Sequence, residues 1–154
     1  MPRQSVKVRG ILAEDLDNIC KLYNDNFPLS PWSKKSFQNF LNDQNRSPLS
    51  LLIKDSGKIA GFVLGRCSKT HPEIFNLNTL LVTEAQRGKG YARVLIEKLV
   101  AIVSKNENIK QITVHFRDNN QLESFYSRLG FSGHQIIGTY SDGEAKHQME
   151  IISN

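Results

Sequence analysis

Apolar positions in this chain follow two patterns, and each pattern predicts a different kind of element. Short apolar or alternating runs predict β-strands. Stretches in which apolar side chains recur every three or four positions predict amphipathic helices. The predicted strands are residues 6–12, 49–54, 58–67, 75–82, 110–117, 135–140 and 146–152. The predicted helices are residues 14–27, 88–104 and 120–129, with a shorter one that begins after Ser33 and carries Phe37, Phe40 and Leu41.

The order of these elements predicts a mixed α/β sheet. Asp55-Ser56-Gly57 is a tight-turn signal, so the consecutive strands of the first half should be antiparallel neighbours. The strand–helix–strand unit over residues 75–117 should be a right-handed parallel crossover, and the last two strands should form a hairpin around Ser141-Asp142-Gly143. We therefore expect a single domain over residues 1–154, with about seven strands and four helices on both faces of the sheet.

Composition narrows the class of protein. The apolar fraction of 39% and the charged fraction of 23% are ordinary for a soluble globular protein. No apolar run is long enough to span a bilayer, and the charged N-terminus lacks the apolar segment of a secretory signal, so we expect a cytoplasmic protein without membrane contact. The net charge of +5 favours an anionic partner only weakly. Because no helix carries a basic stripe with interleaved aromatic residues, we do not expect nucleic-acid binding.

The two cysteines do not predict a disulfide or a metal site. Cys20 and Cys67 lie far apart, each inside an apolar pattern, which favours two buried thiols in a reducing compartment. None of the four histidines stands at metal-ligand spacing from these cysteines; they are His71, His115, His134 and His147. We therefore expect no metal ion.

The turn Arg87-Gly88-Lys89-Gly90 joins a predicted strand to a predicted helix and is the strongest chemical signal in the chain. The first turn of a helix has unpaired N–H groups and partial positive charge, so it can bind a phosphate group. The two glycines lack Cβ atoms and permit close approach of a diphosphate, while Arg87 and Lys89 can add charge. A dinucleotide fingerprint is not met because Arg93 stands at its last glycine position, and Gly-Lys-Ser/Thr of a P-loop is missing.

Two blocks resemble those of the GNAT superfamily of N-acetyltransferases. Val82-x-x-x-x-Arg87-x-x-Gly90-x-Ala92 is similar to its acetyl-CoA-binding signature. Asn119 or Asn120, followed by Phe125-Tyr126-x-x-Leu129-Gly130-Phe131, is similar to its second conserved block, and the spacing between the blocks also agrees. Shorter segments resemble protein Nα-acetyltransferases of the ribosomal-protein (RimI-like) type; they are residues 31–33, 57–64, 115–120 and 140–144.

The resemblance implies acetyl-CoA as co-substrate. Its diphosphate would lie on the backbone amides of Arg87–Ala92, and its pantetheine arm would pair with Leu80–Val82 as an added strand. The fourth and fifth strands must then splay apart, because the fourth cannot pair with both the fifth strand and the cofactor. The implied cofactor-binding residues are Leu80, Leu81, Val82, Arg87, Gly88, Lys89, Gly90, Tyr91, Ala92, Asn119, Asn120 and Tyr126.

The resemblance also implies direct attack of a neutral amine on the thioester. Tyr126 matches the tyrosine expected to protonate the leaving sulfur, and His115 is the candidate base, acting directly or through water. If Asn120 is aligned with the asparagine of the second block, His115 occupies the position of the base in related enzymes. If Asn119 is aligned with it instead, Val114 occupies that position.

Two further aromatic residues are candidates for contact with the acceptor. Tyr140 matches a substrate-side tyrosine of the Nα-acetyltransferases, in a Thr139-Tyr140 pair where many relatives have Tyr-Tyr. Trp32 is either a lid over the substrate groove or a packing contact onto the sheet.

Three functions stay open. The first is acetylation of a protein or peptide N-terminus, and the second is acetylation of a small amine such as a polyamine, an aminoglycoside or an amino acid. A polyamine pocket needs clustered carboxylates, yet Asp43 is the sole acidic residue between Phe27 and Pro48. The third is a non-catalytic acyl-CoA-binding module. We expect a monomer or a homodimer.

Overall fold

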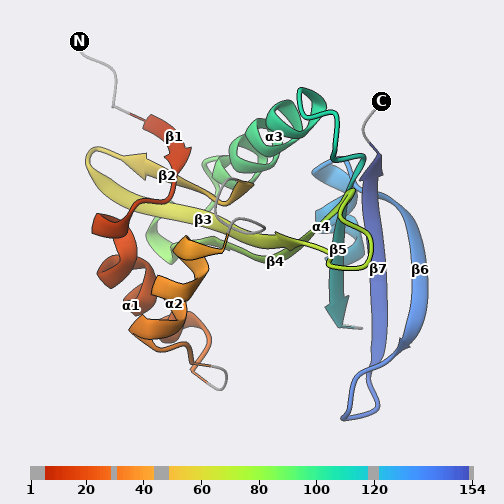
Figure 1. Cartoon of the computed structure of the whole chain (residues 1–154). Helices are drawn as coiled ribbons and strands as arrows, with labels where there is room; N and C mark the ends of the chain where they lie inside the picture. Colours follow the sequence, from red (N-terminus) through yellow and green to blue (C-terminus); the bar gives the residue numbers. More distant parts are fainter. Residues whose placement is uncertain (1–5, 29–30, 44–48, 118–121, 153–154) are drawn as a thin grey trace.

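The computed structural model describes residues 6–28, 31–43, 49–117 and 122–152. Within these ranges, seven strands form one sheet in the order β1-β2-β3-β4-β5-β7-β6 (Figure 1). Neighbours are antiparallel except β4 and β5, which are parallel, so the predicted mixed sheet is confirmed. The strands are β1 Val6–Gly10, β2 Leu51–Asp55, β3 Lys58–Cys67, β4 Ile74–Val82, β5 Gln111–Arg117, β6 Ser132–Thr139 and β7 Ala145–Ile152.

Four α-helices accompany the sheet in the described part of the chain. They are α1 Leu16–Asn26, α2 Lys34–Asn42, α3 Tyr91–Ser104 and α4 Leu122–Arg128. The side chain of Ser33 caps α2 by accepting a hydrogen bond from the Ser36 N–H at 3.1 Å, as predicted. Two predicted starts are wrong. A 3₁₀ turn, Ala13–Asp15, precedes α1, and α3 begins at Tyr91 rather than residue 88, because Gly88 and Gly90 have φ of 83° and 80°, outside the helical region.

The helices cover both faces of the sheet, and each face has its own core. In Figure 1, α1 and α2 lie on one side of the sheet and α3 on the other. Leu95 and Leu99 of α3 are buried with Ile112 of β5, whereas Ile19 of α1 and Phe37 of α2 are buried in a second cluster. Burial of each of these side chains stabilises the fold by roughly 1.5–3 kcal/mol.

The strands β4 and β5 part midway along their length, as predicted. Their pairing covers Ile74–Leu77 of β4 and stops there. At that point the register between β3 and β4 shifts: Leu64 faces Thr79 but Gly65 faces Leu77, so Asn78 is an extra residue. Such a bulge bends its strand. Beyond it β4 stays with β3 while β5 stays with β7, which leaves one edge of Leu80–Val82 without a neighbouring strand among the described residues.

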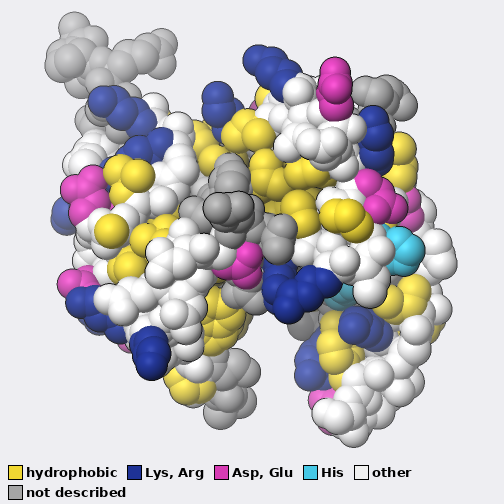
Figure 2. All heavy atoms as spheres, in the orientation of Figure 1, with side chains coloured by type: hydrophobic (Ala, Val, Ile, Leu, Met, Phe, Trp, Pro, Cys, Tyr) yellow, Lys and Arg dark blue, Asp and Glu magenta, His cyan; other side chains and the backbone are white. Residues whose placement is uncertain are grey.

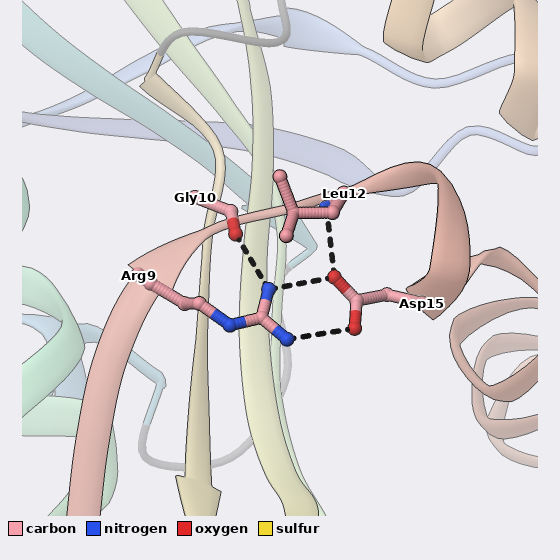
Figure 3. A network of polar contacts seen from close by, with 4 residues as sticks. All are labelled: Arg9, Gly10, Leu12 and Asp15. Atoms are coloured by element: carbon pink, nitrogen blue, oxygen red, sulfur yellow. Dashed lines mark hydrogen bonds and ion pairs between the residues drawn. The ribbon is translucent and has the colours of Figure 1, made fainter.

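An ion pair fixes the connection from β1 to α1 (Figure 3). Two nitrogens of the Arg9 guanidinium donate to the two carboxylate oxygens of Asp15 at 2.8 and 3.0 Å. The Leu12 N–H donates to the same carboxylate at 2.7 Å, and Arg9 also donates to the Gly10 carbonyl. Asp15 is only 3% exposed, so these bonds replace its lost hydration.

Cys20 and Cys67 are free thiols and are half-buried rather than fully buried. Among the described helices, none combines the length and the apolar character needed to cross a bilayer.

Candidate functional site

A cavity of about 590 Å³ lies where the end of β4, the glycine-rich loop, the start of α3 and α4 meet. The structure gathers eight of the predicted cofactor-binding residues around it: Leu80, Leu81, Val82, Arg87, Gly88, Gly90, Tyr91 and Ala92. Asn119 and Asn120 lie outside the described residues.

The loop between β4 and α3 presents its backbone to solvent. The first intrahelical bond runs from the Val94 N–H to the Gly90 carbonyl, so the N–H groups of the three preceding residues have no acceptor within the helix. A Cβ atom built on Gly88 or Gly90 would meet nothing within 4 Å. This open space at the N-terminus of α3 fits an anionic group such as a diphosphate.

The charged side chains that line the cavity are all positive among the described residues. Arg87, Arg93 and Arg128 line it, and none of its described lining residues is acidic. Arg87 also closes the loop, since its Nε donates to the Val82 carbonyl at 3.0 Å, and the Arg93 guanidinium donates to the Arg128 carbonyl. Lys89 does not line the cavity; its Nζ donates to Gln86 Oε1 at 2.7 Å.

Tyr126 does not line this cavity but lies in an aromatic cluster. Its ring centroid is 5.3 Å from that of Phe116 and 5.5 Å from that of Phe131, and its neighbours Phe125 and Leu129 line the cavity. Burial raises the pKa of Tyr126 to about 12. The hydroxyl therefore keeps its proton at neutral pH, as a proton donor must.

Val114 and Phe116 of β5 are buried in the core that α3 covers. His115 lies between them in the strand and therefore points to the opposite face of the sheet. Its Nε2 lies 2.9 Å from Oε1 of Gln148, its partner on β7. An Nε2–H group can donate to this amide oxygen, and in that tautomer the Nδ1 lone pair can accept a proton.

Tyr140 follows β6 and is held by charged neighbours. The Arg117 guanidinium lies 4.2 Å from the ring centroid and Lys146 Nζ lies 5.5 Å from it. Arg117 also pairs with Asp142 at 2.5 Å and with Glu144 at 3.8 Å. The pKa of Asp142 is lowered, mainly by the hydrogen bond from the Glu144 N–H and further by the positive charge of Arg117.

Trp32 packs between the first two helices. Its backbone N–H and carbonyl bind the Asn24 side chain at 2.8 and 2.9 Å. Its ring centroid is 4.9 Å from that of Phe37 and 5.6 Å from that of Tyr23. It thus ties α1 to α2. Figure 2 shows a hollow between the part of the molecule that carries these two helices and the part that carries β5, β6 and β7. Trp32 and Tyr140 come from elements on opposite sides of that hollow.

Sequence reasoning missed three polar residues near these groups. Gln148 could have been found by aligning the predicted strands 110–117 and 146–152 as antiparallel neighbours, which brings it near His115. Arg117 could have been found by its place beside the predicted hairpin turn. Asp55, described below, gave no signal, because its partner lies 36 residues away. No cluster of three or more His, Cys, Asp or Glu that could hold a metal ion occurs in the described ranges.

Comparison with known proteins agrees with this geometry. The sequence is 26% identical over 145 residues to the L-2,4-diaminobutyric acid acetyltransferase of Vibrio parahaemolyticus serotype O3:K6, a match that covers 90% of this chain and 78% of the relative.

Two solved structures share the fold. One is the ribosomal-protein-S18-alanine N-acetyltransferase of Escherichia coli, with a TM-score of 0.76 and 20% identity over 97% of this chain and 96% of the other. The second is the spermidine N-acetyltransferase of Vibrio cholerae in complex with CoA and spermine, with a TM-score of 0.74 and 20% identity over 96% and 95%. The profile of the acetyltransferase (GNAT) family matches residues 16–131. The chain therefore belongs to the GNAT family and is an N-acetyltransferase.

Proposed function

We propose that this enzyme transfers the acetyl group of acetyl-CoA to the α-amino group of a peptide or protein N-terminus. The observation that carries the proposal is the open hollow beside the point where β4 and β5 part (Figure 2). An open hollow fits an extended chain better than it fits a small molecule, which is usually held in an enclosed pocket.

The residues around the cavity fit the acyl donor, which supplies a thioester carbonyl. The unpaired edge of Leu80–Val82 can accept the pantetheine arm as an added strand. The loop from Arg87 to Ala92 offers backbone N–H groups and open space to the diphosphate. The positive charge of the arginines that line the cavity complements the negative charge of the phosphates.

The chemistry needs two proton transfers, and two residues are suited to them. As the amine nitrogen forms the C–N bond and the C–S bond breaks, Tyr126 gives its proton to the departing sulfur. His115 accepts the nitrogen's proton at Nδ1, either directly or through water. An α-amino group has a pKa near 8, against about 10.4 for lysine, so an N-terminus needs less help from the base at neutral pH.

A small amino acid with a second amine is the other candidate acceptor, because the diaminobutyric acid acetyltransferase is a relative. A polyamine is less favoured. Asp43 lies 3.8 Å from Arg66, and Asp142 and Glu144 are paired with Arg117. The charges of these three carboxylates are therefore compensated, and they do not form the acidic cluster that a polycation needs.

Acetyl transfer from labelled acetyl-CoA to N-terminal peptides, lysine peptides, 2,4-diaminobutyric acid and spermidine tests the proposal. We expect turnover on N-terminal peptides. His115→Ala should cost more at pH 7 than at pH 9, where the α-amine is already neutral, and His71→Ala, an exposed histidine elsewhere, should cost nothing. Turnover restricted to diaminobutyric acid would replace the peptide by a small diamine, and CoA binding without any transfer would contradict both.

A further inference from the structure

The turn that joins β2 to β3 is rigid and ends in a well-held carboxylate. Ser56 and Gly57 have φ of 54° and 84°, and two successive positive φ angles are typical of a type I′ hairpin turn. The Ser56 hydroxyl donates to Asp55 Oδ1 at 3.0 Å. The side chain of Asp55 is only 11% exposed. Its orientation is therefore fixed by the hairpin itself.

This carboxylate reaches across to the glycine-rich loop. The Tyr91 hydroxyl donates to Asp55 Oδ2 at 2.5 Å, and Tyr91, the first residue of α3, is only 9% exposed. Lys89 Nζ lies 3.8 Å from the same oxygen. Gly90, with its left-handed backbone, stands between these two anchored residues. A single carboxylate thus holds the loop on both sides of the glycine that begins the helix.

We propose that Asp55 is a positioning residue that fixes the glycine-rich loop in the conformation that binds the diphosphate of acetyl-CoA, an inference that rests on the proposed function. Hydrogen bonds to a charged acceptor are about twice as strong as neutral ones. Holding the loop in place before binding reduces the ordering cost of the complex. Asp55 does not act by attracting the phosphates, because a carboxylate repels them. Its charge is paired with Lys89, and the Tyr91 hydroxyl donates a hydrogen bond to it.

The test compares two acyl donors, one with the diphosphate and one without it. We would measure the Kd of CoA by calorimetry, and the kinetics with acetyl-CoA and with acetyl-pantetheine, for Asp55→Asn, Tyr91→Phe and the double variant. We expect Asp55→Asn to weaken CoA binding by about fivefold to tenfold and to raise KM for acetyl-CoA with little change in kcat. The rate of Asp55→Asn with acetyl-pantetheine should stay at the wild-type level. The double variant should lose less CoA affinity than the sum of the two single losses, because both substitutions break the same Tyr91–Asp55 bond.

Glu84→Gln is the matched control, since Glu84 is an exposed carboxylate in the 3₁₀ turn Glu84–Gln86, just before the loop. It removes the same charge without breaking the bond to Tyr91 and should not weaken CoA binding. Unchanged or tighter CoA binding in Asp55→Asn overturns the proposal, and so does an equal loss with acetyl-pantetheine. If Asp55→Asn does not fold, Tyr91→Phe reports on the same bond. A wild-type enzyme that fails to bind CoA would instead refute the proposed function.

Discussion

Single side chains in this enzyme owe their chemistry to what surrounds them, and Tyr126 is the clearest case. Burial raises the pKa of Tyr126 to about 12, so its hydroxyl stays protonated across the physiological range. We predict that Tyr126→Phe lowers kcat by about 100-fold or more with a much smaller effect on the CoA Kd, because phenylalanine keeps the ring contacts and removes the hydroxyl that donates the proton. The wild-type kcat should also show no loss through tyrosine ionisation up to about pH 11. A Phe variant with wild-type kcat would rule out Tyr126 as the acid.

At the same scale, Asp15 shows how one buried carboxylate contributes to the stability of the fold. Its burial favours the neutral acid, but the hydrogen bonds from Arg9 and from the Leu12 N–H outweigh burial and hold the pKa of Asp15 below its ordinary value of 3.8. A lowered folded-state pKa means that this stabilisation is complete above the ordinary pKa of the carboxyl and is lost as pH falls through the lower folded-state value.

We predict that Asp15→Asn lowers the free energy of unfolding by about 2–4 kcal/mol at pH 7, measured by urea denaturation, because it leaves the Arg9 guanidinium without its ionic partner. The difference between variant and wild type should shrink in acid. Asp17→Asn is the control, since Asp17 pairs with Lys34 at the surface, where their side chains are 77% and 58% exposed. It should change stability by less than about 0.5 kcal/mol. Equal effects of the two substitutions would show that burial does not matter here.

At the scale of the element, two glycines of β3 set how closely β4 can approach. A Cβ atom on Gly61 would lie 2.5 Å from the Leu81 carbonyl oxygen, and one on Gly65 would collide with the Phe75 ring. We predict that Gly61→Ala and Gly65→Ala each destabilise the fold by about 1–3 kcal/mol in thermal or urea denaturation. Gly10→Ala is the control because its Cβ would meet nothing within 4 Å, and it should be neutral or slightly stabilising.

Elements were easier to predict from sequence than the contacts between them. The strands and helices all lie close to their predicted positions because periodicity of apolar residues reflects which face of an element is buried. The start of α3 was misplaced since apolar spacing carries no information about the left-handed glycines before it. The bulge at Asn78 left no local pattern, because it depends on pairing between two strands.

The same limit applies to the candidate site. The loop residues could be predicted because they are contiguous and form a spaced motif. The Asp55–Tyr91 bond could not, since it joins residues brought together only by packing of α3 against the sheet. The His115–Gln148 contact required the register of β5 on β7.

For the whole molecule, the parting of β4 and β5 leaves an edge to which a ligand could add as a further strand. Direct pairing between these two strands is confined to Ile74–Leu77 of β4, so one edge of Leu80–Val82 has no neighbouring strand in the described structure. Amides on an unpaired edge exchange their hydrogens more readily than amides inside a sheet. A ligand that binds as an added strand therefore has a measurable signature.

We predict that CoA slows hydrogen exchange in two segments, Leu80–Val82 and Arg87–Ala92, and that pantetheine, which lacks the diphosphate, slows it only in the first. The reason is that the arm and the diphosphate are assigned to different backbone groups. The hairpin of β6 and β7 should be unaffected by either compound and provides the internal reference. Equal protection of both segments by pantetheine would mean that the loop responds to the arm, and protection confined to other segments would place the co-substrate elsewhere. Because exchange is read segment by segment, this measurement separates the two halves of the cofactor site without any substitution in the chain.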